Sequence, residues 1–266
     1  MTEIQSMSLF IPSSTQVRGH AREMLLRYAN GEIPDWRNGH DGPIEWVKYS
    51  HRGIQRLDNI HIGKKQKRDI FNDQFQIRYD QAFEQVVRCC ADLKRQGKTW
   101  ITEELIDGYL QLHRLGYAHS YEAWQDGKLV GGAFGIHIGG WISVDSMFHH
   151  VDNASKAAYG QTLIRLRDRG FQIVDVNVVS PYMAYFGAEW IPRWQFEVQL
   201  RELIPQNLSL LDDRPPTPLP PSIRLRLKLH RVARALGRRL KVGQENLIRR
   251  ETADEPSALE ENVAAP

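Results

Sequence analysis

The amino-acid sequence predicts an α+β protein, in which helices cover a sheet built mainly from antiparallel strands. Three strand-like runs lie between residues 118 and 148, separated by the turn pairs Asp126-Gly127 and Gly139-Gly140, as in an antiparallel meander. Segments with apolar residues at helical spacing precede and follow these runs. The 266 residues are 41% hydrophobic and 25% charged, which is typical of a globular chain with a sizeable core.

Residues 1–66 predict a small N-terminal α+β domain of irregular structure. Their short apolar stretches, EMLLRYA and PIEWVKY, are separated by turn signals such as Asn-Gly, Asp-Gly and His-Arg-Gly. A basic cluster follows, and either phosphate binding or a solvated linker accounts for it. The cluster consists of Lys64, Lys65, Lys67 and Arg68.

Residues 67–204 predict a second, larger domain. Thr102 is a candidate cap for one helix, and Gly116 and Gly170 are placed to end two of the helices. The expected elements are, in order, a strand at 75–80, helices at 81–96 and 102–115, the meander, a helix at 154–169, and strands at 171–179 and 193–200. This order is similar to that of acetyltransferase-like (GNAT) proteins. We therefore expect a mixed sheet flanked by helices, with 171–179 as a central strand.

No cofactor or metal is expected. Enzymes of the GNAT fold that use acetyl-CoA usually carry a glycine-bearing pyrophosphate loop before their long helix, and the corresponding segment HHVDNASKAAYG lacks that pattern. Cys89 and Cys90 are adjacent and are expected to pack as small hydrophobic residues. The histidines lack the spacing of a zinc site.

The chain is expected to reside in the cytoplasm. No apolar run approaches the roughly 20 residues that span a bilayer, and MTEIQSMSLF lacks the pattern of a signal peptide. Residues 1–204 contain 24 Lys and Arg and 24 Asp and Glu, so the formal charge of +3 arises beyond Ile204. Any nucleic acid bound by residues 1–204 would need local basic patches, and no DNA partner is expected.

Residues 205–266 predict a tail that is dispensable for folding. It contains a proline-rich linker, a basic amphipathic helix within 222–242 and an acidic end that is expected to be disordered. The helix presents Leu225, Leu229, Val232, Leu236 and Leu240 at helical spacing among many arginines. Binding to RNA phosphates, to an anionic membrane surface, or to the protein's own body remain three alternatives.

A series of short motifs in a fixed order resembles the leucyl/phenylalanyl-tRNA–protein transferase family. The motifs are Thr99-Trp100-Ile101, Tyr109, Leu112-His113, Ala118 to Glu122 with Trp124, Leu129 to Gly132, Phe134-Gly135, Asp145 to Phe148, Asn153 to Lys156, Asp175 with Asn177, Gly187-Ala188, and Ile191 with Arg193. In the first domain, GEIPDW and PIEWVKYSHRG resemble the family's GIFPW and PILWWSPDPR. The family's glycine-rich GGDLS-type stretch has no counterpart.

The resemblance implies transfer of Leu, Phe or a similar amino acid from aminoacyl-tRNA to the N-terminal amine of proteins that begin with Arg or Lys, as in N-end-rule degradation. Three departures mark the chain as a diverged member. The family's Glu before Ser-Met-Phe is Asp145 here, its Gln after the strand Asp is Asn177, and an expected His is absent from PYMAY. These changes put the preferred substrates in question.

The resemblance also implies roles for individual residues. Asp175 would orient or deprotonate the attacking amine, with Asn177 two positions on at the same face of the strand. Asp145 would bind the basic first residue of the acceptor. The predicted lining of the donor pocket is Trp100, Phe134, Ile142 and Met147.

Structural roles are the alternative for each of these residues. A lone Asp in an apolar strand is often a satisfied core residue, and aromatic and Met side chains at such spacings usually belong to the core. Glu122 is a further candidate for substrate binding, although an ion pair with Arg193 explains both residues equally well. At the level of the whole chain, the alternatives are an acyltransferase of the same fold with another donor, and a non-catalytic relative that binds RNA or membranes.

Overall fold

The computed structural model of the chain describes residues 19–34, 44–71, 73–92, 99–211, 217–220, 222–225 and 227–229. The chain divides into two compact units, residues 1–223 and residues 224–266. None of the helices in this described part has the length and apolar character that a membrane crossing requires. In the second unit, Leu225 and Leu229 are 59% and 61% exposed. The residues of the predicted basic helix beyond Leu229 lie outside the described part.

The first unit is an α+β structure, as the sequence predicts. Its helices are α1 (Gly19–Ala29), α2 (Lys64–Ile70), α3 (Phe83–Cys90), α5 (Glu103–Arg114), α6 (Ala154–Asp168), α7 (Pro181–Ala184) and α8 (Arg193–Leu203). Its strands are β1 (Ile33–Pro34), β2 (Trp46–Val47), β3 (His51–Arg56), β4 (Gln76–Tyr79), β5 (Ala118–Gln125), β6 (Lys128–Ile138), β7 (Trp141–Ile142), β8 (Ser146–His149), β9 (Ile173–Asn177) and β10 (Glu189–Pro192).

The strands form ladders that are antiparallel throughout. The largest sheet has the order β4-β5-β6-β7, with β8 also paired to β6, and a second sheet has the order β10-β3-β9. An isolated parallel bridge between Ser143 and Asp175 and a hydrogen bond of 2.8 Å from the Val144 N–H to the Asp175 carbonyl join the two sheets. Strand β9 is therefore buried at the junction between the sheets, but the prediction of a single mixed sheet with a central strand here is wrong, because β9 is the last strand of an antiparallel three-stranded sheet and only an isolated bridge joins it to the larger sheet.

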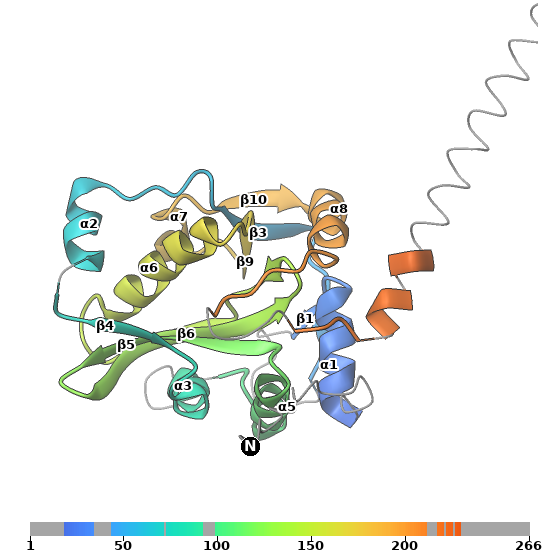
Figure 1. Cartoon of the computed structure of the whole chain (residues 1–266), viewed down its shortest axis with the longest axis horizontal. Helices are drawn as coiled ribbons and strands as arrows, with labels where there is room; N and C mark the ends of the chain where they lie inside the picture. The colour runs from blue at the N-terminus through green and yellow to red at the C-terminus, as the bar shows by residue number, and fades with distance from the viewer. Residues whose placement is uncertain are drawn as a thin grey trace, which may run out of the picture. The chain divides into compact units, whose positions relative to one another are not determined.

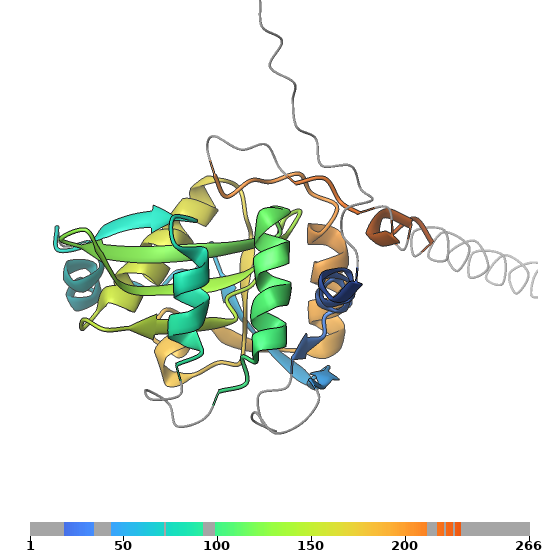
Figure 2. The ribbon, with the colours of Figure 1, turned by 90° about the horizontal axis from the view of Figure 1, so that it is seen from below.

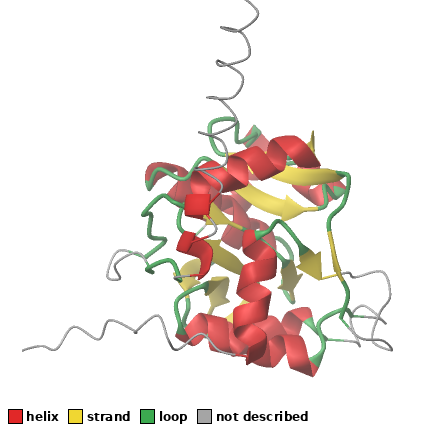
Figure 3. Cartoon of the chain, turned by 90° about the vertical axis from the view of Figure 1, so that its right-hand side faces the viewer, coloured by secondary structure: helices red, strands yellow, loops and turns green. Residues whose placement is uncertain are grey.

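Helices cover both faces of the larger sheet. Helix α6 packs on β5 and β6 from one side, and α3 and α5 pack from the other (Figure 1). The view coloured by secondary structure shows strands, in yellow, with helices, in red, on both sides of them (Figure 3). Helix α5 begins where predicted, because the Thr102 hydroxyl accepts the Leu105 N–H at 3.3 Å. It ends before Gly116, whose φ of +77° suits glycine.

One predicted strand is wrong. Residues 193–200 form the first part of α8, and the strand β10 precedes them. The alternation of Trp194, Phe196 and Val198 with polar residues suggested a strand, but Trp194 is 69% exposed. Phe196, Leu200 and Leu203 are the buried side chains of this segment, and their spacing is helical. Burial on one side of a helix therefore outweighs the local pattern of period two.

The segment before residue 67 shares a sheet with the segment after it. Strand β3 pairs with β9 on one side and with β10 on the other. The second sheet is therefore complete only with residues 51–56, which precede the predicted boundary at residue 66. The domain boundaries at residues 66 and 204 remain predictions.

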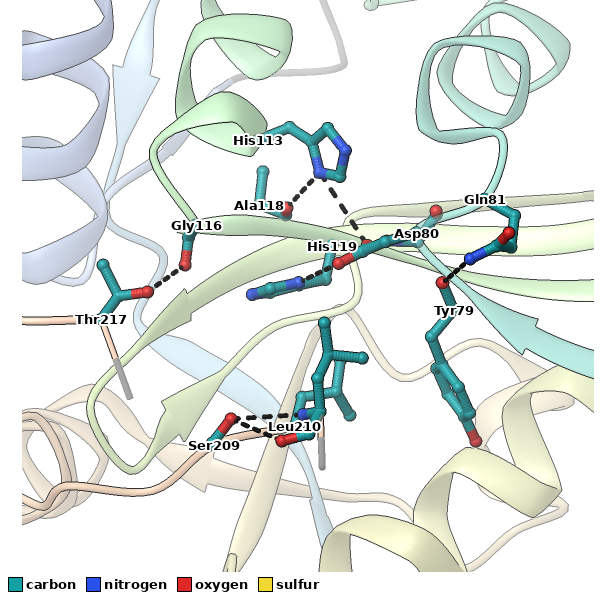
Figure 4. Close-up of polar contacts among 12 residues, drawn as sticks. Tyr79, Asp80, Gln81, His113, Gly116, Ala118, His119, Ser209, Leu210 and Thr217 are labelled. Carbon is teal, nitrogen blue, oxygen red and sulfur yellow. Dashed lines mark hydrogen bonds and ion pairs between the residues drawn. The ribbon is translucent and has the colours of Figure 1, made fainter. Parts of the chain in front are cut away.

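A buried carboxylate joins β4, α5 and β5. Asp80 accepts the Ser120 N–H at 2.9 Å and lies 2.7 Å from Nδ1 of His119, and His113 lies within ion-pair distance (Figure 4). Burial by itself would raise the pKa of Asp80, but the contacts with His119 and the Ser120 N–H outweigh it and hold the pKa below its usual value. This cluster aligns the start of β5 with β4.

The chain beyond α8 packs on the first unit. Arg165 donates to the Leu210 carbonyl at 3.0 Å, and Arg169 donates to the carbonyls of Ser209 and Leu211 at 2.5 and 2.9 Å. Leu210 and Leu211 belong to the hydrophobic core. Figure 2 shows the described part of this segment, in orange, along the body of the unit.

A second group of contacts continues this attachment. The Thr217 hydroxyl donates to the Gly116 carbonyl at 2.8 Å (Figure 4), the Tyr117 hydroxyl donates to the Pro218 carbonyl at 2.5 Å, and Ile223 is buried. These contacts argue against the expectation that everything after residue 204 is dispensable for folding, because the segment up to Ile223 packs on the first unit.

Two truncations test this packing. Removal of residues 224–266 should leave the free energy of unfolding unchanged within about 0.5 kcal/mol, as for changes away from the core. Removal of residues 205–266 should lower it by at least about 3 kcal/mol, since a buried Leu or Ile contributes roughly 1.5–3 kcal/mol. Urea unfolding followed by circular dichroism measures both. Leu210→Ala in the full chain should cost about 2–4 kcal/mol, and equal stability of all the variants would contradict the packing described here.

Candidate functional site

A cavity of about 430 Å³ opens where the two sheets meet. Its walls come from β1, the segment Val144–Met147, the end of β9 and the loop that leads into α7. Four of the predicted site residues line it, namely Trp100, Asp145, Met147 and Asn177. Residues that are distant in the sequence thus converge on one apolar cavity with a few polar groups, which is typical of a ligand site.

The backbone of β6 brings Asp145 into this wall. A side chain at Gly135 would collide with the Ser143 carbonyl, because a Cβ there would lie 1.9 Å from that oxygen. The segment that contains Ser143 can therefore run directly against β6, and the Asp145 N–H donates to the Phe134 carbonyl at 2.9 Å. Glycine in the Phe134-Gly135 motif is thus required by close packing.

Hydroxyl groups from separate elements hold the Asp145 carboxylate. Tyr28 of α1 and Tyr109 of α5 donate to Oδ2 at 2.6 and 3.0 Å, and Ser143 donates to Oδ1 at 2.7 Å. The two tyrosine oxygens are 2.5 Å apart. The N-terminal segment therefore takes part in building the cavity.

Burial controls the protonation of this cluster. Burial raises the pKa of Asp145, and the negative charge of Asp175 raises it further. The hydroxyl donors of Tyr28, Ser143 and Tyr109 lower this pKa, but they do not outweigh burial, so the net shift is upward. Burial, together with the charge of Asp145, also raises the pKa of Tyr28 and of Tyr109 well above the usual value. Both tyrosines are therefore protonated hydrogen-bond donors at neutral pH.

Asp175 lies behind the cavity wall. Its side chain is fully buried and is not among the groups that line the cavity. Arg52 of β3 donates to Oδ1 from Nε and to Oδ2 from Nη2, both at 2.8 Å. The Asn177 N–H donates to Oδ1 at 3.0 Å. The predicted pair of Asp175 and Asn177 is adjacent, but only Asn177 reaches the cavity.

Asn177 carries an unpaired acceptor. It ends β9 with a φ of +61°, and its Nδ2 lies 3.4 Å from both the Val144 carbonyl and Oδ1 of Asp145. Its Oδ1 is buried and has no hydrogen-bond partner within the described residues. A buried acceptor without a partner is costly, and because this oxygen is closed to solvent, a ligand donor could reach it only after the side chain had moved.

The other predicted residues lie elsewhere. Phe134 and Ile142 are fully buried core residues that do not line the cavity. Glu122 is buried and accepts the Ala82 N–H at 2.8 Å, the Ser120 hydroxyl at 2.7 Å and the Trp124 indole N–H at 2.8 Å. Arg193 does not pair with Glu122, since its guanidinium donates to the Lys48 carbonyl at 3.4 Å. The substrate roles of Phe134, Ile142 and Glu122 remain predictions.

Sequence reasoning assigned no role to Tyr28, Arg52 or Ser143. Weak signals existed: Tyr28 is in the apolar stretch EMLLRYA, and Arg52 is in the segment that resembles the family pattern. Neither signal indicated which distant carboxylate these side chains would contact.

A second cavity of about 500 Å³ adjoins the first and shares Met147 and Tyr182 with it. Its other lining residues are polar and include Lys156, His149 and Asn153. Within the described ranges, no three His, Cys, Asp or Glu side chains are grouped so that they could hold a metal ion.

Comparison with known proteins identifies the family. A family model described as leucyl/phenylalanyl-tRNA protein transferase matches residues 54–201. The chain belongs to this family. The leucyl/phenylalanyl-tRNA–protein transferase of Gloeobacter violaceus is 39% identical over 180 residues, which cover 67% of this chain and 91% of that protein. The transferase of Paramagnetospirillum magneticum is 37% identical over 187 residues, which cover 70% and 90%.

Membership of the transferase family confirms the resemblance derived from the motifs. The segment that matches the family model contains Asp145, Asp175 and Asn177, whereas Tyr28 and Arg52 precede it. Among solved structures, L-PGS from Bacillus licheniformis is similar at 15% identity and a TM-score of 0.36, over 60% of this chain and 51% of that one.

The hydroxyl cluster of this transferase predicts a pH-dependent loss of stability. Since the folded state raises the pKa of Asp145, ionisation of Asp145 lowers stability as the pH rises through that pKa. Tyr28→Phe removes a donor that favours the ionised form, so it should cost about 1.5–3 kcal/mol at pH 7.5 and less near pH 4. Urea unfolding at both pH values measures the difference.

Tyr159→Phe is the matched control, because the Tyr159 hydroxyl is buried and has no hydrogen-bond partner among the described residues. It should be neutral at both pH values. An equal loss for Tyr28→Phe at pH 4 and pH 7.5 would rule out the coupling to Asp145.

Proposed function

We propose that this protein transfers Leu, Phe or a similar amino acid from aminoacyl-tRNA to the N-terminal amine of acceptor proteins that begin with Arg or Lys. The observation that carries the proposal is the convergence, within the segment that matches the transferase family, of Asp145 and Asn177 on one apolar cavity. In the cell, this reaction would mark proteins for N-end-rule degradation in the cytoplasm.

The reaction depends more on the correct placement of the two substrates than on chemical activation of the ester. The ester of aminoacyl-tRNA is already reactive, so the acceptor nitrogen forms a bond to the ester carbonyl carbon and the bond from that carbon to the ribose oxygen breaks. One proton leaves the nitrogen, and the ribose oxygen gains one. An enzyme accelerates such a step by holding both reactants in the correct orientation. No covalent nucleophile is needed, and the proposal requires no cofactor.

The cavity supplies complementary walls for the two substrates. Trp100, Met147, Val176 and Met183 offer apolar surface for the side chain of the transferred amino acid. The side-chain amide of Asn177, which lines the cavity, would orient the attacking amine. The adjoining polar cavity, with Lys156, is a place for the ribose and phosphate at the end of the tRNA.

Asp145 is the group proposed to select basic acceptors. Its carboxylate is the acidic group that lines the cavity, and a charge-assisted hydrogen bond favours an ammonium or guanidinium group over a neutral one. Because Asp is one methylene shorter than the Glu of the family pattern, the acceptor would have to approach more closely.

We extend the proposal to the fold and to the tail. The antiparallel β5–β6 hairpin, the helix α6 that follows β8 and the buried β9 support a GNAT-like arrangement. The exposed Leu225 and Leu229 beside Arg224 and Lys228 are compatible with RNA or membrane contact by the tail.

A direct transfer assay tests the function. The protein is incubated with radiolabelled Leu-tRNA or Phe-tRNA and a peptide that begins with Arg, and in parallel with acetyl-CoA. Label should appear on the N-terminus of the peptide only with aminoacyl-tRNA. Transfer from acetyl-CoA would instead support an acyltransferase with another donor. Absence of transfer with retained tRNA binding would support a non-catalytic relative.

The variant Asp145→Asn tests the selection of acceptors. The apparent KM for an Arg peptide should rise about 10-fold, which corresponds to about 1.4 kcal/mol, and the preference over a peptide beginning with Ala should fall. Asp126→Asn, at an exposed turn, is the control and should behave as the wild type. An unchanged preference in a folded Asp145→Asn enzyme would remove Asp145 from acceptor recognition.

A further inference from the structure

The chain becomes strongly basic where the first unit ends. Residues 222–243, called the basic segment below, contain eight Lys and Arg residues and no Asp or Glu. Because the whole chain has a formal charge of only +3, the remainder of the chain is net negative. The match to the family model ends at residue 201, so the basic segment lies outside the part that this chain shares with the model. The shared transferase fold therefore does not account for this concentration of positive charge.

Two leucines at the start of the basic segment are exposed to solvent. The described residues between 222 and 229 are helical, and Leu225 and Leu229, four positions apart, are 59% and 61% exposed. At helical spacing, Ile223 and Leu227 fall on the opposite side, where Ile223 is 2% exposed and Leu227 is only partly exposed. Leu225 and Leu229 are therefore on the uncovered side.

The sequence continues the apolar stripe that these leucines begin. Val232, Leu236 and Leu240 follow at helical spacing, although they lie outside the described residues. On a helix of 3.6 residues per turn, these three residues and the two exposed leucines would fall within about 80° of one another. The Lys and Arg residues would occupy the rest of the circumference. This pattern is typical of helices that lie in the interface between lipid and water.

RNA would account for the charge of the basic segment but not for its leucines. RNA phosphates would pair with Lys and Arg, while the apolar stripe would stay in water. Proteins that bind single-stranded RNA commonly stack bases on aromatic side chains, and residues 222–243 contain no Phe, Tyr or Trp. An anionic lipid surface suits both sides of the helix, because its phosphates attract the basic residues and its acyl chains accept the leucines.

We propose that the basic segment holds this transferase on an anionic phospholipid surface. Leu225 and Leu229 enter the boundary of the acyl chains, and the exposed side chains of Arg224 and Lys228 pair with headgroup phosphates. The electrostatic part of the attraction is screened by salt. This inference goes beyond the proposed aminoacyl transfer, because it assigns a separate binding function to residues outside the cavity. It would bring the enzyme close to acceptor proteins at a membrane.

Vesicle flotation with the full-length chain tests the proposal. The protein should float with vesicles of phosphatidylcholine that also contain phosphatidylglycerol, and it should remain in solution with vesicles of phosphatidylcholine alone. High salt should weaken the binding, since each basic residue near the surface contributes electrostatic attraction. Absence of binding to the anionic vesicles, or equal binding to both kinds of vesicle, would overturn the proposal.

A matched pair of variants tests the apolar stripe. Leu229→Ser should lower the partition coefficient on anionic vesicles at least about 10-fold, because burial of a leucine side chain contributes that much or more. Leu227→Ser is the control, since it makes the same chemical change two positions away on the opposite side of the helix. Its partition coefficient should stay within about threefold of the wild type. Equal losses in the two variants would contradict insertion of the stripe.

A charge variant separates lipid from RNA. Arg224→Gln with Lys228→Gln should lower binding to anionic vesicles about 10-fold or more. Leu229→Ser should bind tRNA as the wild type does, because its charges are intact. A wild type that ignores vesicles, together with a charge variant that binds tRNA more weakly, would assign the basic segment to RNA and overturn the proposal.

The outcome for lipid binding is independent of the outcome for catalysis. Leu229→Ser should transfer Leu to a soluble Arg peptide at the rate of the wild type in the absence of vesicles, because residue 229 follows the segment that matches the family. A wild type that binds anionic vesicles but transfers no amino acid would contradict the proposed function alone. A wild type that transfers amino acids but binds no vesicles would overturn only the lipid proposal.

Discussion

The bidentate ion pair between Arg52 and Asp175 is the contact on which the geometry of the site depends. Strand β3 contributes Arg52, β9 contributes Asp175, and Phe196 of α8 covers the guanidinium. These elements come from separate parts of the chain, so they can be aligned only in the folded state. Loss of either partner would lower the stability of the protein by several kcal/mol, because the remaining charge would be buried without a partner. A single misplacement at this point would move the end of β9 and with it the wall of the cavity.

The hydroxyl cluster on Asp145 adds a second connection between distant segments. Tyr28 and Tyr109 reach the same carboxylate oxygen from α1 and α5, while Ser143 binds the other oxygen from the chain beside β6. A carboxylate held in this way keeps one orientation in an apolar wall. The N-terminal segment is therefore part of the cavity wall, because Tyr28 holds a carboxylate that lines the cavity.

The position of the C-terminal segment follows from ordinary burial. Leu210 and Leu211 complete the core beside α6, and the side chains of Arg165 and Arg169 satisfy the carbonyl groups of the segment as it passes. These carbonyl groups lie outside a helix or strand, so side chains on the body of the protein supply their donors. The first unit consequently extends to Ile223, well beyond the end of α8.

The sequence alone determined the α+β class, most of the helices and strands, the family, and four of the residues at the cavity, because these depend on local signals. Thr102, Gly116 and the hydrophobic periodicity act within a few residues, and the motifs fix the order of Trp100, Asp145, Met147 and Asn177. Only the tertiary structure decided that residues 193–200 form a helix, since one-sided burial outweighs a local alternation. It also decided that Phe134 and Ile142 belong to the core and that Asp175 faces Arg52 rather than the cavity. Those outcomes depend on contacts between residues 123 positions apart, as for Arg52 and Asp175, and no local pattern specifies which partner a buried charge will meet.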